Sequence, residues 1–323
     1  MQKLAKALFL FLIIACGSDT GSKIISSSGV IDPNTGNGGN DGNGGDDSIP
    51  DLVVELISSY NDDTASFSTV FGNYTRSFIV HTPPNYDSNN GPIPLLFVLH
   101  GYTGQAPGIR NYSGFDSIAD EENFIVVYVQ GVADQITNNT GWNAGVGTFI
   151  NVDDVGLFSA LIKYFKGNYN IADDKIFSTG MSMGGFMSYR LACELEEINS
   201  IGSVTGSMAA YYNCVPPNQK SIIHFHGTAD TVVPYNGNSW SINVENVHSL
   251  WANHNECQNN SEVTIPDFNG DGVLSTQLTS YDCNGNREVI LYTMENEGHT
   301  WFKKEWGHDV DTSRLIWEFF KDK

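Results

Sequence analysis

Ser182 lies in the segment of this chain that most clearly favours covalent chemistry. It is the central residue of Gly180-Met-Ser-Met-Gly184, a G-x-S-x-G pattern, and Gly185 follows directly. Small neighbours permit a tight strand-to-helix turn that lifts a serine hydroxyl clear of a sheet. At the start of such a helix, the backbone N–H of Met183 can stabilise an oxyanion. We predict that Ser182 is a nucleophile; the alternative is a glycine-rich turn without chemistry.

A serine hydroxyl is a poor nucleophile alone, so a base and an acid partner are expected further along the chain. On a strand-turn-helix scaffold their order is serine, then Asp or Glu, then His. His299 follows an apolar run at residues 288–293 and precedes the last helical pattern. Asp230 follows a run that ends at His226, and loops at the carboxyl ends of parallel strands collect active-site residues. We predict His299 as the base and Asp230 as the acid that orients it.

The second oxyanion donor is expected in a loop after an earlier strand. The segment His100-Gly-Tyr102-Thr-Gly104 follows the apolar run at residues 94–99 and has the His-Gly shape that this loop needs. We predict that the Tyr102 backbone N–H is this donor, and that the Tyr102 ring can line the pocket.

Apolar runs and helical patterns alternate along the chain from about residue 51. Strands are predicted at residues 76–82, 94–100, 124–130, 175–180, 221–226 and 288–293, and helices at 152–165, 183–196, 244–252 and 312–320. This alternation predicts a mostly parallel central sheet with helices on both faces. Together with the serine turn it indicates an α/β-hydrolase fold in one catalytic domain, residues 51–323.

The first residues are typical of an export signal. Lys3 and Lys6 precede an apolar run that is shorter than the roughly 18 residues needed to span a membrane. The run ends in Ile13-Ile-Ala-Cys16, which resembles the lipobox of bacterial lipoproteins. We predict a lipoprotein signal peptide at residues 1–15 with lipidation of Cys16; the alternative is an ordinary secretory peptide.

Residues 16–50 are rich in Gly, Asn, Asp and Ser and are predicted to be a flexible tether. The net charge of the chain is −21, and loss of Lys3 and Lys6 with the signal peptide changes it to −23. This acidity disfavours nucleic acid and anionic membranes as partners. We expect an exported protein, lipid-anchored at the bacterial cell envelope or secreted, that contacts membrane only through its lipid.

Four cysteines remain besides Cys16, namely Cys193, Cys214, Cys257 and Cys283. An even number in an exported protein predicts two disulfides, with three pairings open. We choose the pairing of sequence neighbours, Cys193 with Cys214 and Cys257 with Cys283, which closes two short loops. Four free thiols are the alternative, and a zinc site is disfavoured because no C-x-x-C spacing is present.

Four other histidines need an interpretation. His224 and His226 have i, i+2 spacing on a predicted strand and therefore share one face. A metal site is one interpretation, and a buried hydrogen-bonded pair is the favoured one. His248 and His254 lie in a predicted helical region and are expected at the surface.

Residues 259–282 include a segment that mimics a calcium-binding loop. It has the D-x-N-x-D-G pattern from Asp267 through Asp271 to Gly272, but its twelfth position is Leu278 rather than Glu. We interpret it as a hairpin tip, leave calcium open, and predict no metal ligands and no cofactor for the reaction. Asp267 and Asp271 are also the substitutes for Asp230 as the acid.

Several motifs together resemble the polyhydroxybutyrate-depolymerase-like esterases, the group that includes the feruloyl and acetylxylan esterases of carbohydrate esterase family one. The resemblance covers nearly all of residues 65–305. The motifs that carry it are Leu99-His-Gly-Tyr102, Gly141-Trp-Asn143, Val152-Asp-Asp-Val-Gly156, Gly180-Met-Ser-Met-Gly-Gly185, His226-Gly-Thr-Ala-Asp230 and Gly298-His-Thr-Trp301.

This resemblance implies an exported serine esterase acting on aryl or acetyl esters of polysaccharides or oligosaccharides, or on polyesters. The family's nucleophile, acid and base correspond to Ser182, Asp230 and His299. Trp142 and Trp301 look like family pocket residues whose rings could stack on a substrate, with core packing as the alternative. Cysteines at similar positions recur in such enzymes, which favours the pairing of neighbours.

Three rival functions use the same motifs. A polyester depolymerase would share the residues, although the family's depolymerases carry a separate binding domain for which this chain has no room. A serine peptidase of the same fold would cleave amides. A surface glycan-binding protein that lost catalysis is the rival from another class, and the occupied catalytic positions argue against it.

Overall fold

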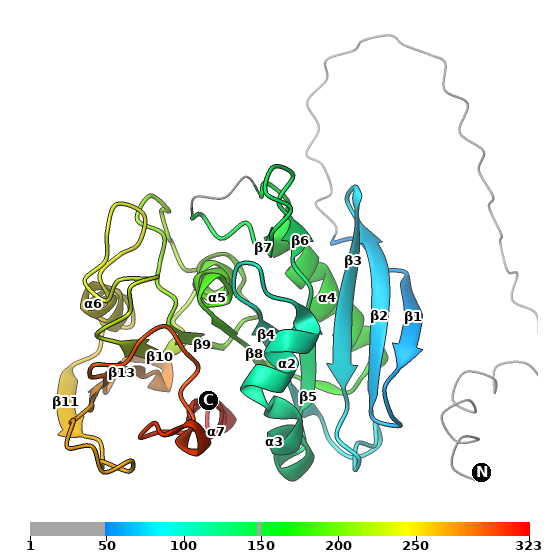
Figure 1. Ribbon diagram of the computed structural model, residues 1–323. Helices are drawn as coiled ribbons and strands as arrows, with labels where there is room; N and C mark the ends of the chain where they lie inside the picture. The colour runs from blue at the N-terminus through cyan, green and yellow to red at the C-terminus, as the bar shows by residue number, and fades with distance from the viewer. Residues whose placement is uncertain (1–48, 147–149) are drawn as a thin grey trace, which may run out of the picture. The chain divides into compact units, whose positions relative to one another are not determined.

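The computed structural model describes residues 49–146 and 150–323, and within these residues eleven strands form one mixed sheet (Figure 1). The strand order across the sheet is β1-β2-β3-β5-β4-β8-β9-β10-β13-β12-β11. Two short strands, β6 (Val132–Ala133) and β7 (Thr140–Gly141), pair separately. The strands of the large sheet are β1 (Val54–Ser59), β2 (Thr64–Phe71), β3 (Tyr74–His81), β4 (Ile93–Leu99), β5 (Ile125–Val129), β8 (Ile171–Met181), β9 (Ser200–Val204), β10 (Ser221–Gly227), β11 (Asn259–Thr264), β12 (Thr276–Tyr281) and β13 (Val289–Met294).

Helices pack against both faces of this sheet. They are α2 (Ala106–Ser113), α3 (Phe115–Glu122), α4 (Asp154–Asn168), α5 (Met183–Glu194), α6 (Val244–His254) and α7 (Thr312–Lys321), with 3₁₀ turns η1 (Asn284–Asn286) and η2 (Lys304–Trp306). The strands from β5 through β4, β8, β9 and β10 to β13 are parallel, whereas the strands beyond them on both sides pair antiparallel. The carboxyl ends of β8, β10 and β13 therefore lie at the same end of the parallel strands.

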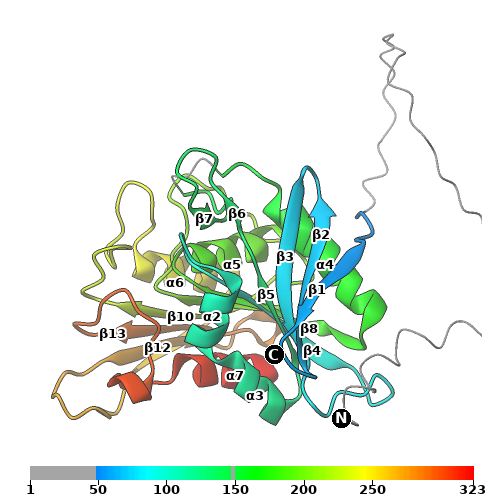
Figure 2. The same ribbon diagram turned by 45° about the vertical axis from the view of Figure 1, so that its right-hand side comes forward.

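Alternation along the central strands produces a core on each face of the sheet. In β4, Leu95, Phe97 and Leu99 join one core and Leu96 and Val98 join the other, because successive side chains point to opposite faces. Helices α4, α5 and α6 cover the first core, and α2, α3 and α7 cover the second. Figure 2 shows α5 and α6 on one side of β10 and β13, and α3 and α7 on the other.

The structure confirms the predicted central strands and helices and adds elements that the patterns did not reveal. The added elements include the antiparallel edge strands β1, β2, β11 and β12, the central strand β9, and the short helices α2 and α3. β1 and β11 are mostly exposed, so they lack the apolar runs by which the central strands were recognised.

Two disulfides join the predicted cysteine pairs, Cys193 with Cys214 and Cys257 with Cys283. The first ties the end of α5 to the segment before β10, and the second ties the end of α6 to the end of β12. The interpretation of residues 259–282 as a hairpin is confirmed, because β11 and β12 pair antiparallel from Asn259 with Tyr281 to Thr264 with Thr276.

The predicted signal peptide at residues 1–15, the lipidation of Cys16 and all but the last two residues of the predicted tether lie outside the described residues. Among the residues that are described, no helix is both long and apolar enough to span a membrane.

Candidate active site

Ser182 lies on a sharp turn between β8 and α5. Its backbone has φ 53° and ψ −122°, a conformation that costs energy in a residue other than glycine. The Ser182 N–H donates to the Val204 carbonyl at 2.8 Å, which fixes the turn against β9. A side chain at Gly184 would place its Cβ 2.3 Å from the Leu99 oxygen, so the turn can pack against β4 only with glycine there.

Asp230 and His299 meet at the carboxyl ends of the parallel strands, where Ser182 also lies. Asp230 lies three residues after β10, and its Oδ2 accepts a hydrogen bond from His299 Nδ1 at 2.7 Å. The other oxygen, Oδ1, accepts the backbone N–H groups of Val232 at 2.8 Å and Val233 at 2.9 Å. Because a carboxylate only accepts, the proton of a neutral His299 lies on Nδ1 and leaves Nε2 free to accept.

The environment of Asp230 keeps it ionised. Burial alone would raise the pKa of this carboxyl, but hydrogen bonds from His226, His299 and the Val233 N–H outweigh burial and hold the pKa well below its ordinary value. Asp230 therefore carries a negative charge beside the His299 imidazole throughout the neutral range. His299 Nδ1 contacts Asp230 and neither substitute: the Asp267 carboxylate accepts N–H groups of its own loop, and Asp271 Oδ1 accepts from Val273.

A pocket of about 340 Å³ joins Ser182 to the loop that carries Asp230. Tyr102 and Met183 line it next to Ser182, and Val232 and Val233 line it from the Asp230 loop. The other lining residues are Val146, Phe186 and Trp240. Phe186 follows Ser182 by four residues in α5, so helical spacing could have identified it. Trp240 lies in a loop without a sequence signal.

The loop that contains Tyr102 is held so that its N–H can serve as a donor. The Gly101 oxygen contacts His100 Nδ1 at 2.7 Å and accepts the Gly104 N–H at 2.9 Å. In a trans peptide the N–H points away from the carbonyl, so the Tyr102 N–H is directed away from these partners. Within the part of the chain that the structure describes, neither this N–H nor that of Met183 has a hydrogen-bond acceptor.

His100 is buried beneath this loop in the neutral form. Its Nε2 accepts the Gly131 N–H at 2.9 Å, which places the ring proton on Nδ1, where it donates to Gly101. Burial lowers the pKa of His100 to about 4, with a further lowering from Arg76, although the hydrogen bond to Gly101 acts in the opposite direction. His100 is therefore a structural support of the loop rather than a base.

This buried histidine makes the free energy of unfolding depend on pH. The folded pKa of about 4 lies below the ordinary histidine pKa of 6.5, so the unfolded chain binds a proton that the folded chain excludes between these pH values. Stability is expected to fall as the pH falls, by about 2 kcal/mol between pH 7 and pH 5 from His100 alone. Urea unfolding at both pH values measures this difference.

The matched variant for this prediction is His100→Gln, which has no ring to titrate. It should be less stable at pH 7 but should lose less stability on going to pH 5 than the native chain. An equal loss in both proteins would contradict the assignment of this pH dependence to His100.

The predicted role of Trp142 and Trp301 as pocket walls is wrong. Both side chains are 0% exposed, so neither can present a ring to a substrate. The Trp142 indole N–H donates to the His100 carbonyl at 2.8 Å, and the Trp301 indole N–H donates to Ser313 Oγ at 2.9 Å. Trp142 belongs to the core on the α5 face of the sheet and Trp301 to the core on the α7 face.

The four other histidines interpreted from the sequence fall into two groups. His224 and His226 form the predicted buried pair, with His224 Nε2 and His226 Nδ1 at 3.1 Å. The expectation that His248 lies at the surface is wrong, since it is buried in α6 with Nε2 at 3.2 Å from the Val289 oxygen. Helical spacing places it on the face of α6 that packs against β13. His254, near the end of α6, is partly exposed.

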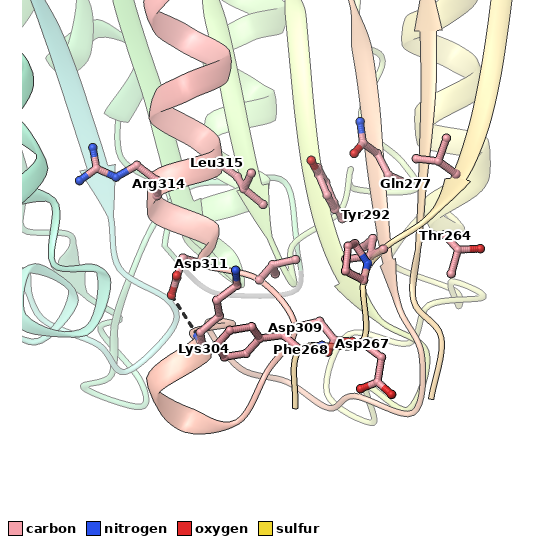
Figure 3. Close-up of a pocket in the computed structure, with 14 residues that line it drawn as sticks. Thr264, Asp267, Phe268, Gln277, Tyr292, Lys304, Asp309, Asp311, Arg314 and Leu315 are labelled. Atoms are coloured by element: carbon pink, nitrogen blue, oxygen red, sulfur yellow. Dashed lines mark hydrogen bonds between the residues drawn. The ribbon is translucent and has the colours of Figure 1, made fainter. Parts of the chain in front are cut away.

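A larger cavity of about 560 Å³ lies between the β11–β12 hairpin, η2 and the start of α7, and none of Ser182, Asp230 and His299 lines it (Figure 3). Its charged groups are engaged with neighbouring protein groups. Asp311 accepts the Lys304 N–H at 3.0 Å, Asp309 accepts the Phe268 N–H at 2.8 Å, and Arg314 pairs with Glu121. We place the chemistry in the smaller pocket, because that pocket contains Ser182.

Comparisons with known proteins agree with this architecture. Residues 68–289, more than half of the 323-residue chain, match a family model described as "Putative esterase". A probable feruloyl esterase C of Aspergillus oryzae is 31% identical over 226 residues, which are 69% of this chain and 76% of that protein. A feruloyl esterase D of Neurospora crassa is 26% identical over 263 residues, which are 76% of this chain and 81% of that protein.

A solved structure of an acetyl xylan esterase from Aspergillus awamori has a similar fold. It matches with a TM-score of 0.52 and 14% sequence identity, over 84% of this chain and 100% of that one. The predicted α/β-hydrolase fold is thereby confirmed, with antiparallel strands added at both edges of the parallel sheet. The resemblance to esterases of the feruloyl and acetylxylan type is confirmed by the family match and the curated relatives.

Proposed function

Because the chain belongs to this esterase family and is a carboxylic ester hydrolase, we propose that it works through an acyl-enzyme on Ser182, with His299 as base and Asp230 as the acid partner. The observation that carries the proposal is the 2.7 Å hydrogen bond between His299 Nδ1 and Asp230 Oδ2. Both residues follow the carboxyl ends of parallel strands, as Ser182 does. It leaves His299 Nε2 as an acceptor for the serine proton.

In the first step, His299 Nε2 takes the hydroxyl proton as Ser182 Oγ attacks the ester carbonyl. The tetrahedral intermediate places its negative oxygen against the N–H groups of Tyr102 and Met183, which have no other acceptor among the residues that the structure describes. The charged Asp230 stabilises the imidazolium that forms. His299 then gives its proton to the departing alcohol, and the Ser182 ester remains.

In the second step, water enters and His299 removes one of its protons. The resulting hydroxide attacks the acyl carbonyl, the same two N–H groups hold the oxyanion, and His299 returns a proton to Ser182. The cycle consumes one ester and one water and releases one acid and one alcohol. No cofactor takes part in these steps.

We propose that the substrate is a feruloyl or acetyl ester carried by a polysaccharide. The relatives named above as feruloyl esterases support this class, and so does the apolar pocket beside Ser182. Trp240, Phe186 and Val146 offer apolar surface to an aromatic acyl group, and such contact is favourable at about 25 cal/mol per Å² of buried area. We also propose export, with residues 1–15 as signal peptide, Cys16 as lipid anchor, residues 16–50 as tether and residues 51–323 as the catalytic domain.

The test is an activity panel on protein produced without residues 1–16. Methyl ferulate, acetylated xylan, a short polyester and matched p-nitrophenyl ester and anilide substrates are compared, and Ser182 is assayed for labelling by a fluorophosphonate probe. We expect labelling and the highest kcat/KM on methyl ferulate or acetylated xylan. Release of monomer from the polyester alone would favour a depolymerase, faster anilide cleavage a peptidase, and an unlabelled Ser182 a glycan-binding protein.

A further inference from the structure

A chain of buried hydrogen bonds runs from α5 to the back of Asp230. The Tyr189 hydroxyl lies 2.9 Å from His224 Nδ1, and His224 Nε2 lies 3.1 Å from His226 Nδ1. His226 Nε2 lies 2.8 Å from the Val233 oxygen and 3.4 Å from Asp230 Oδ2. Tyr189, His224 and His226 are 1%, 2% and 0% exposed, so no solvent competes for these contacts.

The direction of every donor in this chain follows from the acceptors at its end. A carbonyl and a carboxylate only accept, so His226 Nε2 carries a proton. Neutral His226 then has a bare Nδ1, which accepts from His224 Nε2–H. By the same rule, His224 Nδ1 accepts the Tyr189 hydroxyl proton. All the donors therefore point toward Asp230, an arrangement in which each bond polarises the next.

The neutral state agrees with the surroundings of both rings. Burial, reinforced by the neighbouring His226 and His248, lowers the pKa of His224 well below its ordinary value, although a contact with the Gly206 backbone acts in the opposite direction. A second proton on His226 would lie on Nδ1, so the hydrogen bonds from His224 and Tyr189 would have to reverse their direction. The other titratable groups nearby are Tyr235, whose ring lies 6.0 Å from the His226 ring, Glu245 on the Tyr235 hydroxyl, and His248 on the α6 side of His224.

We propose that Tyr189, His224 and His226 form a buried relay that positions Asp230, and that His226 is a positioning residue for the reaction proposed above, on which this inference rests. His226 acts on Asp230 through two contacts. It donates to the Val233 carbonyl while the Val233 N–H donates to Asp230 Oδ1, and its Nε2 also lies close to Oδ2. The carboxylate is thereby fixed in the plane that meets His299.

The relay also affects the basicity of the imidazole. His226 and His299 are both directed at Oδ2, so the two donors compete for one oxygen. Without the His226 N–H, the negative charge on Asp230 Oδ2 interacts more strongly with His299. This interaction stabilises the protonated form of His299. The acid limb of kcat/KM, which reports the protonation of the base, should then move to higher pH.

The protonation states are tested first, because that measurement does not depend on activity. The full chain is labelled with ¹⁵N-histidine, and the ring nitrogens of His224 and His226 are assigned by their absence in His224→Gln and His226→Gln. We expect both rings to be neutral with the proton on Nε2 at pH 7. A doubly protonated His226, or one protonated on Nδ1 alone, would overturn the relay.

The kinetic test compares His226→Phe, which keeps an aromatic ring but has no ring nitrogens, with His226→Gln, whose amide can still donate. In His226→Phe we expect kcat to fall about ten- to a hundredfold with little change in KM, because a loosened acid lets the base drift by up to about 1 Å. The acid limb should move up by about half a pH unit. His226→Gln should recover most of both properties.

His248→Phe is the matched control, since it removes a buried histidine outside the relay and should lower stability without moving the limb. If the acid limb of kcat/KM in His226→Phe stays at the native pH or moves to lower pH, the relay is overturned. Ser182→Ala, assayed in parallel, separates the two proposals. An inactive Ser182→Ala with an unmoved limb in His226→Phe refutes the relay alone, whereas a fully active Ser182→Ala refutes the proposed function.

Discussion

Ser182→Ala is expected to lower kcat on p-nitrophenyl acetate by about 10⁶-fold, because the acyl-enzyme route loses its nucleophile and the remaining parts of the site act as a unit with it. Residual hydrolysis would come from the oxyanion donors and the base acting on bound water. The fold should be retained, since alanine has a smaller side chain and the Ser182 side chain makes no hydrogen bond among the described residues. Single-turnover and steady-state kinetics measure the loss.

Ser188→Ala is the control for this variant. Ser188 lies in α5, the helix that begins directly after Ser182, but it is buried, and its hydroxyl contacts Ser178 at 2.8 Å rather than the pocket. Its loss should lower the free energy of unfolding while leaving kcat near the native value. A Ser182→Ala protein with native turnover would refute the acyl-enzyme on this residue.

Asp230→Asn is expected to lower kcat by about 10⁴-fold, because it reverses the proton on His299. Oδ1 of Asp230 accepts two backbone N–H groups, from Val232 and Val233, so the amide oxygen of an asparagine must take that place. The amide NH₂ then faces His299 Nδ1 and makes it an acceptor. The imidazole proton moves to Nε2, which can no longer accept the proton of Ser182.

Asp267→Asn makes the same chemical change at the tip of the β11–β12 hairpin, where the carboxylate binds N–H groups of its own loop. It should retain native kcat, whereas Asp230→Asn should be nearly inactive and should fold. Circular dichroism and urea unfolding verify the fold of both variants. Activity of Asp230→Asn within tenfold of native would show that Asp230 does not orient the base.

Local sequence patterns predicted those features of the structure that depend on residues close together in the chain. The G-x-S-x-G pattern predicted the turn at Ser182, because glycine is needed within two residues of it on each side. The apolar run at residues 94–99 predicted a strand buried on both faces, and β4 is one. Ser182, Asp230 and His299 each follow a predicted parallel strand. Because parallel strands share one direction, the three loops were expected at the same end of these strands.

Only the tertiary structure determined which side chains are shielded from solvent, which line a pocket and which form hydrogen bonds between separate elements. Trp142 and Trp301 occur in motifs next to the site, yet packing against opposite faces of the sheet buries both. Trp240 and Val146 line the pocket, although nothing in their local sequence marks them. The link from Tyr189 through His224 and His226 to Asp230 joins a helix, a strand and a loop. Residue spacing encodes backbone conformation over one or two turns, whereas these contacts depend on how separate elements pack together.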